Sequence, residues 1–202
     1  MSFDYKLTDI KFNIDKLVPL DVCKYFIDIY ENNKKYAVSE KSYKYKKEKF
    51  EKDNYECLNL TWLSAENNTF TEPLNVAKKY IQIMIANYEL HIKKNICPSF
   101  NSRLISNSDN IRIIKYKKGQ YIKDHTDVGY SNISGHAIRA SCTLNLNEDY
   151  EGGEFRFFNG RVKYSFKTGD AMLFPAEPIW IHGTEPVTKG ARYSINCFLH
   201  HL

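Results

Sequence analysis

The feature that most constrains the fold is a succession of short β-type segments in the second half of the chain. We expect strands, rich in β-branched and aromatic residues and separated by turn signals, at residues 110–116, 121–125, 138–146, 153–158, 162–166, 171–175 and 192–199. The pair Asn159-Gly160 stands between two aromatic-rich segments and predicts a hairpin. Short strands with regular turns indicate a sandwich or jelly roll rather than a parallel sheet.

The first half of the chain has helical periodicity instead. Apolar residues recur on one face of residues 19–30 and again on one face of residues 72–94. The second segment follows Thr71-Glu72-Pro73, which fits a capped start with proline in the first turn. We therefore expect two helices before the β-rich half.

Length and composition indicate the class of protein. A chain of 202 residues with 43% hydrophobic and 26% charged residues is typical of a globular protein. With no internal repeat and no linker, we expect a single domain, 1–202, in which a helical support region, 1–100, precedes a β core, 101–202. No apolar run reaches the ~20 residues of a membrane span, and the N-terminus does not resemble a signal peptide. The five scattered cysteines argue against a disulfide framework, so we expect a cytoplasmic location.

Lysine is concentrated in residues 34–53, which contain eight lysines, and the net charge is +5. This segment is either a patch for nucleic acid or an acidic partner, or simply a solvated surface. We favour the solvated surface, because lysine runs are commonly no more than that. A nucleic-acid partner is therefore not expected, and the role of the segment stays open.

Two histidines and a carboxylate form a candidate metal site. Residues i and i+2 of a strand project to the same side, so His125 and Asp127 point together if they stand at a strand end. Such a pair alone is often only a surface pair, and the third ligand, His182, comes from elsewhere in the chain. This ligand set is the facial triad of non-haem Fe(II) oxygenases. Arg192 adds a rigid fork that suits a carboxylate, which indicates a dicarboxylic co-substrate.

These residues and their surroundings resemble the Fe(II)/2-oxoglutarate-dependent dioxygenases, in the prolyl 4-hydroxylase-like branch. The stretches that carry the resemblance lie between Ile111 and Leu199 and are 116–127, 139–147, 149–155, 167–175 and 182–194. The resemblance implies an α+β, mainly β fold, with a double-stranded β-helix (jelly-roll) core and supporting N-terminal helices.

The resemblance also implies roles for individual residues. The catalytic metal ligands would be His125, Asp127 and His182, which would bind Fe(II). Arg192 and Ser194 would hold the distal carboxylate of 2-oxoglutarate, and Tyr116 would line the same pocket.

Weaker expectations concern the pocket walls. We expect Leu144, Phe155 and Asn196 to line the pocket, and Trp180 and Arg139 to stand at its mouth. Where some members of the branch carry a tyrosine that donates to the distal carboxylate, this chain has Leu146.

The expected function is hydroxylation of an amino-acid side chain, with peptidyl proline first and a small molecule as the other substrate class. The cofactors would be Fe(II), 2-oxoglutarate, O2 and ascorbate. One alternative is nucleic-acid demethylation, but that branch usually has a further arginine shortly after the position of Arg192, and this chain has none there. A second alternative is a cupin-like metal-binding module without catalysis. The oligomeric state is left open.

Overall fold

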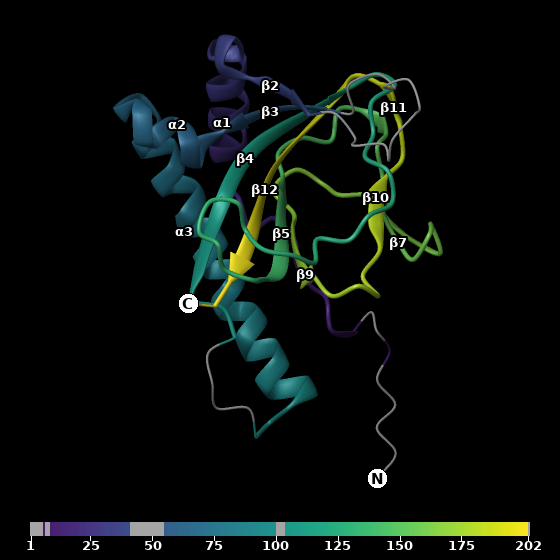
Figure 1. The fold of residues 1–202 in the computed structure, drawn as a ribbon. Helices are drawn as coiled ribbons and strands as arrows, with labels where there is room; N and C mark the ends of the chain where they lie inside the picture. Colours follow the sequence, from purple (N-terminus) through teal and green to yellow (C-terminus); the bar gives the residue numbers. More distant parts are fainter. Residues whose placement is uncertain (1–5, 7–8, 41–54, 100–103, 202) are drawn as a thin grey trace, which may run out of the picture.

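The computed structural model describes residues 6, 9–40, 55–99 and 104–201 as a mainly antiparallel β structure flanked by helices (Figure 1). The larger sheet has the strand order β1-β9-β5-β12-β4-β3-β2. Its strands are β1 (Phe12–Ile14), β2 (Val38–Glu40), β3 (Tyr55–Asn59), β4 (Asn107–Lys117), β5 (Ile138–Asn145), β9 (Ala171–Pro175) and β12 (Ala191–His200). The central strands β4, β5 and β12 are the longest of them, so they form the main wall of the barrel.

A smaller sheet lies opposite this wall (Figure 1). It has the order β10-β7-β8, with β7 (Phe155–Phe157), β8 (Val162–Tyr164) and β10 (His182–Thr184). A two-stranded ribbon pairs β6 (Glu151–Gly152) with β11 (Val187–Lys189). The facing sheets form the predicted jelly-roll core, and the fold class is confirmed.

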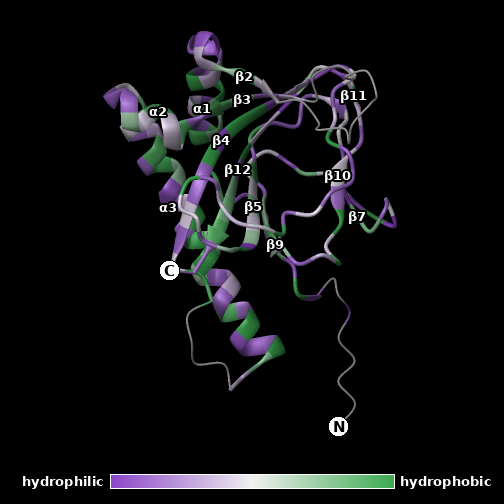
Figure 2. Ribbon diagram, in the orientation of Figure 1, coloured by the Kyte–Doolittle hydropathy of each residue, from purple (hydrophilic) through white to green (hydrophobic). Residues whose placement is uncertain are grey.

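Three helices cover the outer face of the larger sheet: α1 (Leu20–Asn32), α2 (Leu60–Glu66) and α3 (Thr71–His91). Short helical turns join them to the strands at Lys34–Tyr36, Asn68–Phe70 and Ile92–Ile96. Residues such as Phe26 of α1 and Met84 of α3 share one buried cluster with Ile113, Leu144 and Ile195 of the sheet. Figure 2 shows green, hydrophobic residues toward the arrowhead of β12 and both green and purple faces on the helices. The apolar helix faces are therefore buried against the sheet.

Glu31, near the end of α1, ties this helix to the sheet. It accepts hydrogen bonds from Lys115 of β4 and Tyr193 of β12, each at 2.7 Å, and pairs with Lys34. Partial burial alone would raise the pKa of Glu31, but these three hydrogen bonds outweigh it and lower the pKa to about 2. The carboxylate is therefore charged over the whole neutral range.

The sequence-based expectations agree with the structure for most elements. The two predicted helices correspond to α1 and α3, and the Asn159-Gly160 hairpin joins β7 to β8, with Phe158, Asn159 and Gly160 all at positive φ. All five cysteines are free. The predicted strand 121–125 is wrong, because His125 makes only an isolated bridge there.

The N-terminal half also contributes strands that the sequence analysis missed. β1, β2 and β3 extend the larger sheet at both of its edges. Most of the lysine-rich segment, residues 41–54, lies outside the described residues. Among the described residues, no helix combines the length and the apolarity that crossing a bilayer requires.

Candidate active site

Three potential metal ligands meet between the two sheets. One ligand atom each from His125, Asp127 and His182 lies within 4.8 Å of the others. The two histidines face each other across an isolated antiparallel bridge, in which each backbone N–H donates to the other's carbonyl at 2.9 Å. This bridge sets their ring centroids 4.3 Å apart. The structure thus brings together the predicted triad, and iron binding by it stays a prediction.

In both histidines Nδ1 is hydrogen-bonded to a backbone carbonyl, so Nε2 is the ring nitrogen that faces the cluster. Nδ1–H of His125 donates to the carbonyl of Lys123 at 2.8 Å, and Nδ1–H of His182 donates to the carbonyl of Trp180 at 3.0 Å. A carbonyl oxygen can only accept, so each Nδ1 carries a proton and each Nε2 is left toward Asp127. A hydrogen bond of this kind on the second nitrogen orients a ligating histidine toward its metal.

Asp127 supplies the negative charge of the cluster. Its carboxylate oxygens lie 3.4 Å from Nε2 of His125 and 3.3 Å from Nε2 of His182, and it accepts a hydrogen bond from Oγ of Ser141. Burial would raise the pKa of Asp127, but the hydrogen bonds and charges of the two histidines hold it well below its usual range. Burial would likewise lower the pKa of His125, whereas Asp127 raises it. The cluster therefore offers one anionic oxygen and two nitrogens.

Aromatic rings from both sheets wall the cluster: Phe155 of β7 and Phe174 of β9. The ring of His182 stacks on Phe155 with centroids 5.4 Å apart, and Phe174 meets it edge-on at 4.7 Å. Trp180, expected at the mouth, is instead only 2% exposed and packs behind Phe157 and Phe158, so that expectation is wrong. The wall lowers the polarity around the ligands and limits the access of water.

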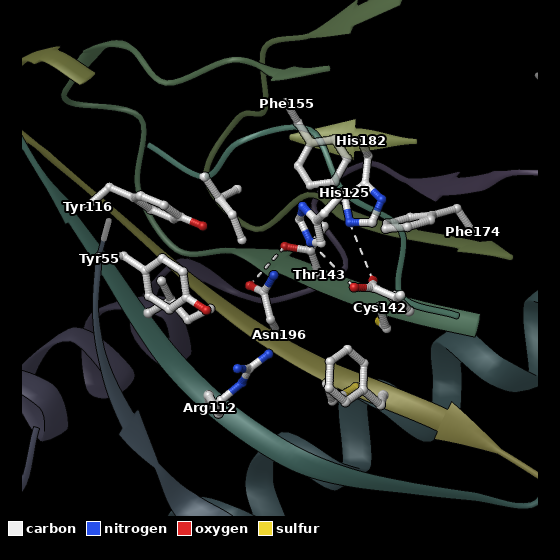
Figure 3. A pocket seen from close by; sticks show the side chains of 16 residues that line it. Tyr55, Arg112, Tyr116, His125, Cys142, Thr143, Phe155, Phe174, His182 and Asn196 are labelled. Atoms are coloured by element: carbon white, nitrogen blue, oxygen red, sulfur yellow. Dashed lines mark hydrogen bonds and ion pairs between the residues drawn. The ribbon is translucent and has the colours of Figure 1, made fainter. Parts of the chain in front are cut away.

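A cavity of about 220 Å³ extends from the cluster into the barrel (Figure 3). Paired residues of antiparallel strands share a face, so the register of β4, β12 and β5 divides its main wall into layers. Successive layers are two residues, or about 7 Å, apart along a strand. From the metal cluster inward they are first Ser141 and Phe198; second Arg112, Asn196 and Thr143; third Ile114, Ser194 and Asn145; fourth Tyr116 and Arg192.

Arg192 lies in the fourth layer, 1% exposed, at the inner end of this wall. Its Nε donates to Oδ1 of Asn145 at 3.3 Å, and the side chain of Tyr150 is hydrogen-bonded to both residues. The guanidinium carbon lies 5.6 Å from the centroid of Tyr116, a ring that lines the cavity. Burial raises the pKa of Tyr116 despite the opposing charge of Arg192, so its hydroxyl stays protonated and can donate.

Ser194, in the third layer, does not line the cavity itself but hydrogen-bonds a residue that does. Its Oγ donates to Oδ1 of Asn196 at 2.8 Å, and Oγ1 of Thr143 donates to the same oxygen at 3.3 Å. Asn196 and Phe155 line the cavity, as expected. The carbonyl oxygen of Asn196 is therefore engaged twice.

The expectation that Leu144 lines the cavity is wrong by one residue. Leu144 and Leu146 belong to the buried cluster under the helices, so neither faces the cavity. The inward position beside Ser194 is held by Asn145, which accepts a hydrogen bond from Arg192 and which the sequence analysis missed. It also missed Arg112, which lines the cavity four residues before Tyr116, at a spacing that places both on one face of β4.

The residues present fit an Fe(II) ion and a dicarboxylic acid. Two imidazoles and one carboxylate are the donor set of the facial triad, which keeps positions open for other ligands. A buried guanidinium held in place by Asn145 and Tyr150 presents a fork that matches a carboxylate. The site therefore holds both elements of an Fe(II)/2-oxoglutarate pocket.

Comparison with known proteins agrees with this geometry. Residues 111–200 match the family model described as the 2OG-Fe(II) oxygenase superfamily. The chain is 36% identical over 88 residues to a PKHD-type hydroxylase of Janthinobacterium sp. (strain Marseille), covering 40% of this chain and 38% of that protein. It is 32% identical over 89 residues to another from Idiomarina loihiensis, covering 42% and 39%. The chain spans half or less of the length of the curated relatives it matches.

Solved structures share the fold at low identity. The viral collagen prolyl hydroxylase of Paramecium Bursaria Chlorella virus-1, solved with 2OG, superposes with a TM-score of 0.61 at 15% identity, over 96% of both chains. A Pseudomonas putida prolyl-4-hydroxylase superposes with a TM-score of 0.63 at 12% identity, over 97% of both. The family match, the shared fold and the gathered triad agree: residues 111–200 are similar to the 2OG-Fe(II) oxygenase superfamily, and the fold is prolyl hydroxylase-like.

Proposed function

We propose that this protein is an Fe(II)- and 2-oxoglutarate-dependent dioxygenase that hydroxylates an amino-acid side chain, with a peptidyl prolyl residue as the first candidate substrate. The observation that carries the proposal is one cavity lined by His125, Asp127 and His182, with the buried Arg192 beyond its inner wall. Bound iron and 2-oxoglutarate would supply the oxidation of a C–H bond.

The residues of the chain hold the reaction partners and shape their surroundings. His125, Asp127 and His182 would hold Fe(II), and Ser141 fixes the orientation of the Asp127 carboxylate. Arg192 would hold the distal carboxylate of 2-oxoglutarate, with the hydroxyl of Tyr116 near the same group. The aromatic wall keeps water away from the reacting atoms.

Exposed apolar side chains near the ligands support a peptide substrate. Val128 and Tyr130 closely follow Asp127, and Ile179 closely precedes His182; their exposed fractions are 54%, 77% and 56%. Exposed apolar side chains grouped beside a cavity are typical of contact surfaces for another chain. One structurally similar protein, from Trichoplax adhaerens, was solved in complex with a peptide fragment of the hypoxia inducible factor oxygen degradation domain, at 13% identity and a TM-score of 0.64. A small-molecule substrate is the other candidate.

Two further expectations are kept as proposals: an ascorbate requirement, which would keep the iron reduced, and a cytoplasmic location. A nucleic-acid substrate ranks behind the peptide because no second arginine follows Arg192 in β12.

Succinate release with Fe(II) and 2-oxoglutarate tests the function. Proline-containing peptides, free amino acids and methylated oligonucleotides are compared as stimulating substrates, and Asp127→Ala serves as the inactive control. Succinate formation that depends on iron and disappears in Asp127→Ala supports the enzyme. If the chain binds Mn(II) and 2-oxoglutarate by calorimetry but forms no succinate with Fe(II), the binding-only module replaces it.

A further inference from the structure

We propose that Arg156 is a positioning residue of the candidate metal site, because it ties the segment that carries His125 to the strands that carry and support His182. This inference rests on the proposed function, since it concerns the geometry in which the chain would hold Fe(II). Arg156 stands in β7 next to Phe155, whose ring stacks on His182, but the arginine itself is not among the residues that line the cavity.

The two histidines differ in their backbone support. His182 belongs to β10, and every residue of β10 pairs with β7. His125 lies outside the named strands and pairs with His182 through one isolated bridge. Beside this bridge, Ile122 and Thr184 exchange two hydrogen bonds of 3.0 Å, one of them to the hydroxyl of Thr184. The position of His125 therefore depends more than that of His182 on contacts made by side chains.

A row of four residues crosses this part of the smaller sheet. In the antiparallel register Lys163 pairs with Arg156, and Arg156 pairs with Gly183. The isolated bridge continues the row, because it places Asp124 opposite Gly183. Gly183 has no side chain, and a Cβ atom there would lie 2.8 Å from Oδ1 of Asp124. The bare backbone of Gly183 thus leaves the space through which Arg156 reaches Asp124.

Arg156 bonds one carboxylate beside each histidine. Its Nε donates to Oδ1 of Asp124 at 2.9 Å, and its Nη1 donates to Oε2 of Glu185 at 3.0 Å. Asp124 directly precedes His125, and Glu185 follows His182 by three residues. The side chain of Arg156 is 18% exposed, so these contacts are less screened than those of a fully solvated pair. A planar guanidinium with two engaged edges fixes direction as well as distance.

The charge of Arg156 separates positioning from simple electrostatics. Lys163 pairs with Glu185 at 2.7 Å, so the network of Asp124, Arg156, Glu185 and Lys163 has two charges of each sign and a net charge of zero. Without Arg156 the network is left with one net negative charge. Coulomb attraction alone would then strengthen the binding of a divalent cation nearby. Displacement of the ligands would weaken it, so the two effects have opposite signs.

The test measures the metal affinity of the full chain. Mn(II) binding is followed by EPR titration, at a temperature at which circular dichroism shows each metal-free variant to be folded. The variants are Arg156→Met and Arg156→Lys. Lys163→Met is the matched control, because it removes a cation of the same network that pairs with Glu185 rather than with the His125 segment. Arg161→Met, on the β7–β8 turn, controls for the loss of an arginine.

We expect Arg156→Met to weaken Mn(II) binding about threefold to tenfold, less than the loss of a group bonded directly to a ligand typically costs. Arg156→Lys keeps the charge but lacks the fork, so its affinity should be intermediate. Lys163→Met and Arg161→Met should bind Mn(II) at least as tightly as the wild type. The EPR line shape of bound Mn(II) should change in Arg156→Met and in neither control, since displaced ligands alter the symmetry around the ion.

Three results overturn the role of Arg156. They are a Mn(II) affinity in Arg156→Met at or above that of the wild type, an equal loss in Lys163→Met, and an unchanged line shape in Arg156→Met. If Arg156→Met is unfolded at the titration temperature, Arg156→Lys decides in its place, and wild-type affinity in that variant overturns the role. A wild-type chain that binds no Mn(II) would refute the proposed function itself, so the two failures are distinct.

Discussion

Replacing Arg192 with methionine tests whether the inner end of the cavity holds the distal carboxylate of 2-oxoglutarate. Arg112 lines the cavity, and Arg192 is buried two layers deeper on the paired strands. Methionine keeps much of the length of the side chain and removes its charge. The guanidinium lies within 6 Å of the rings of Tyr116 and Phe166, so the thioether would pack against aromatic surface and the fold should persist.

The expected magnitude follows from the burial of Arg192. At 1% exposure, little water is available to replace the lost contact with a carboxylate. A hydrogen bond to a charged group contributes about 1.5–3 kcal/mol, and a two-point contact contributes more. The hydroxyl of Tyr150 remains as a neutral donor and offsets part of the loss. We therefore expect a net cost of about 2–3 kcal/mol, which weakens 2-oxoglutarate binding by about 30- to 150-fold.

Calorimetric titration of the Mn(II)-loaded protein with 2-oxoglutarate measures this cost directly. Mn(II) affinity is determined in parallel and should not change, because Arg192 stands three layers from the first layer. Arg192→Lys keeps the charge without the fork and should fall between the wild type and Arg192→Met. Arg161→Met should bind 2-oxoglutarate as the wild type does.

A 2-oxoglutarate affinity within threefold of the wild type in Arg192→Met would refute the assignment. If Arg112→Met then showed the large loss, the distal carboxylate would be at the second layer and Arg192 would be a structural residue held by Asn145 and Tyr150. If neither variant lost affinity, the cavity would not be a 2-oxoglutarate pocket.

Three other changes have defined outcomes. Ser141→Ala removes the donor to Asp127 and should weaken Mn(II) binding about tenfold in an EPR titration; unchanged affinity would mean that the histidines alone orient the carboxylate. Glu31→Gln should cost about 1 kcal/mol at pH 7 in urea unfolding, a value reduced for solvent screening. Because the folded pKa of Glu31, about 2, lies below its ordinary 4.5, this stabilisation is complete above about pH 5 and disappears as the pH falls toward 2, where wild type and variant should converge. Gly152→Ala should cost more than about 2 kcal/mol, since φ is +74° and the added carbon would lie 2.3 Å from a backbone oxygen; Gly119→Ala, at φ +83° with open space around it, should cost only about 1–2 kcal/mol. Similar melting curves for the two alanine variants would show that the close approach at Gly152 relaxes.

Most of the β core could be predicted because its turns have distinct chemistry. Asn159-Gly160 has the positive φ values that the pair favours, and the strands on either side lie where expected. The triad was predictable for a different reason. The residue types and spacing of His125, Asp127, His182 and Arg192 are typical of few sites other than this kind of metal site. The residue types and their spacing therefore carried the prediction.

The edge strands could not be predicted from local pattern. β1 and β2 are three residues long, too short for an alternation of apolar and polar residues to emerge. β1 exists because it pairs with β9, and β2 because it pairs with β3. Such strands depend on a long-range partner, which no window of the sequence contains.

The error at β5 has a physical cause. Ala140 to Asn145 are all buried, since one face of β5 packs on the helices and the other faces the cavity. A strand buried on both sides does not reveal its inward face by alternation. Only pairing with β12 shows that Asn145, rather than Leu144 or Leu146, stands beside Ser194.

The same register converts position along a strand into depth in the cavity. Arg112 and Arg192 belong to different strands 80 residues apart in the sequence, yet the pairing of β4 with β12 sets them two layers apart on one wall. Two cations at one depth would compete for the same carboxylate. Their depths differ by about 13 Å along the strands, so a carboxylate held by Arg192 would lie away from Arg112.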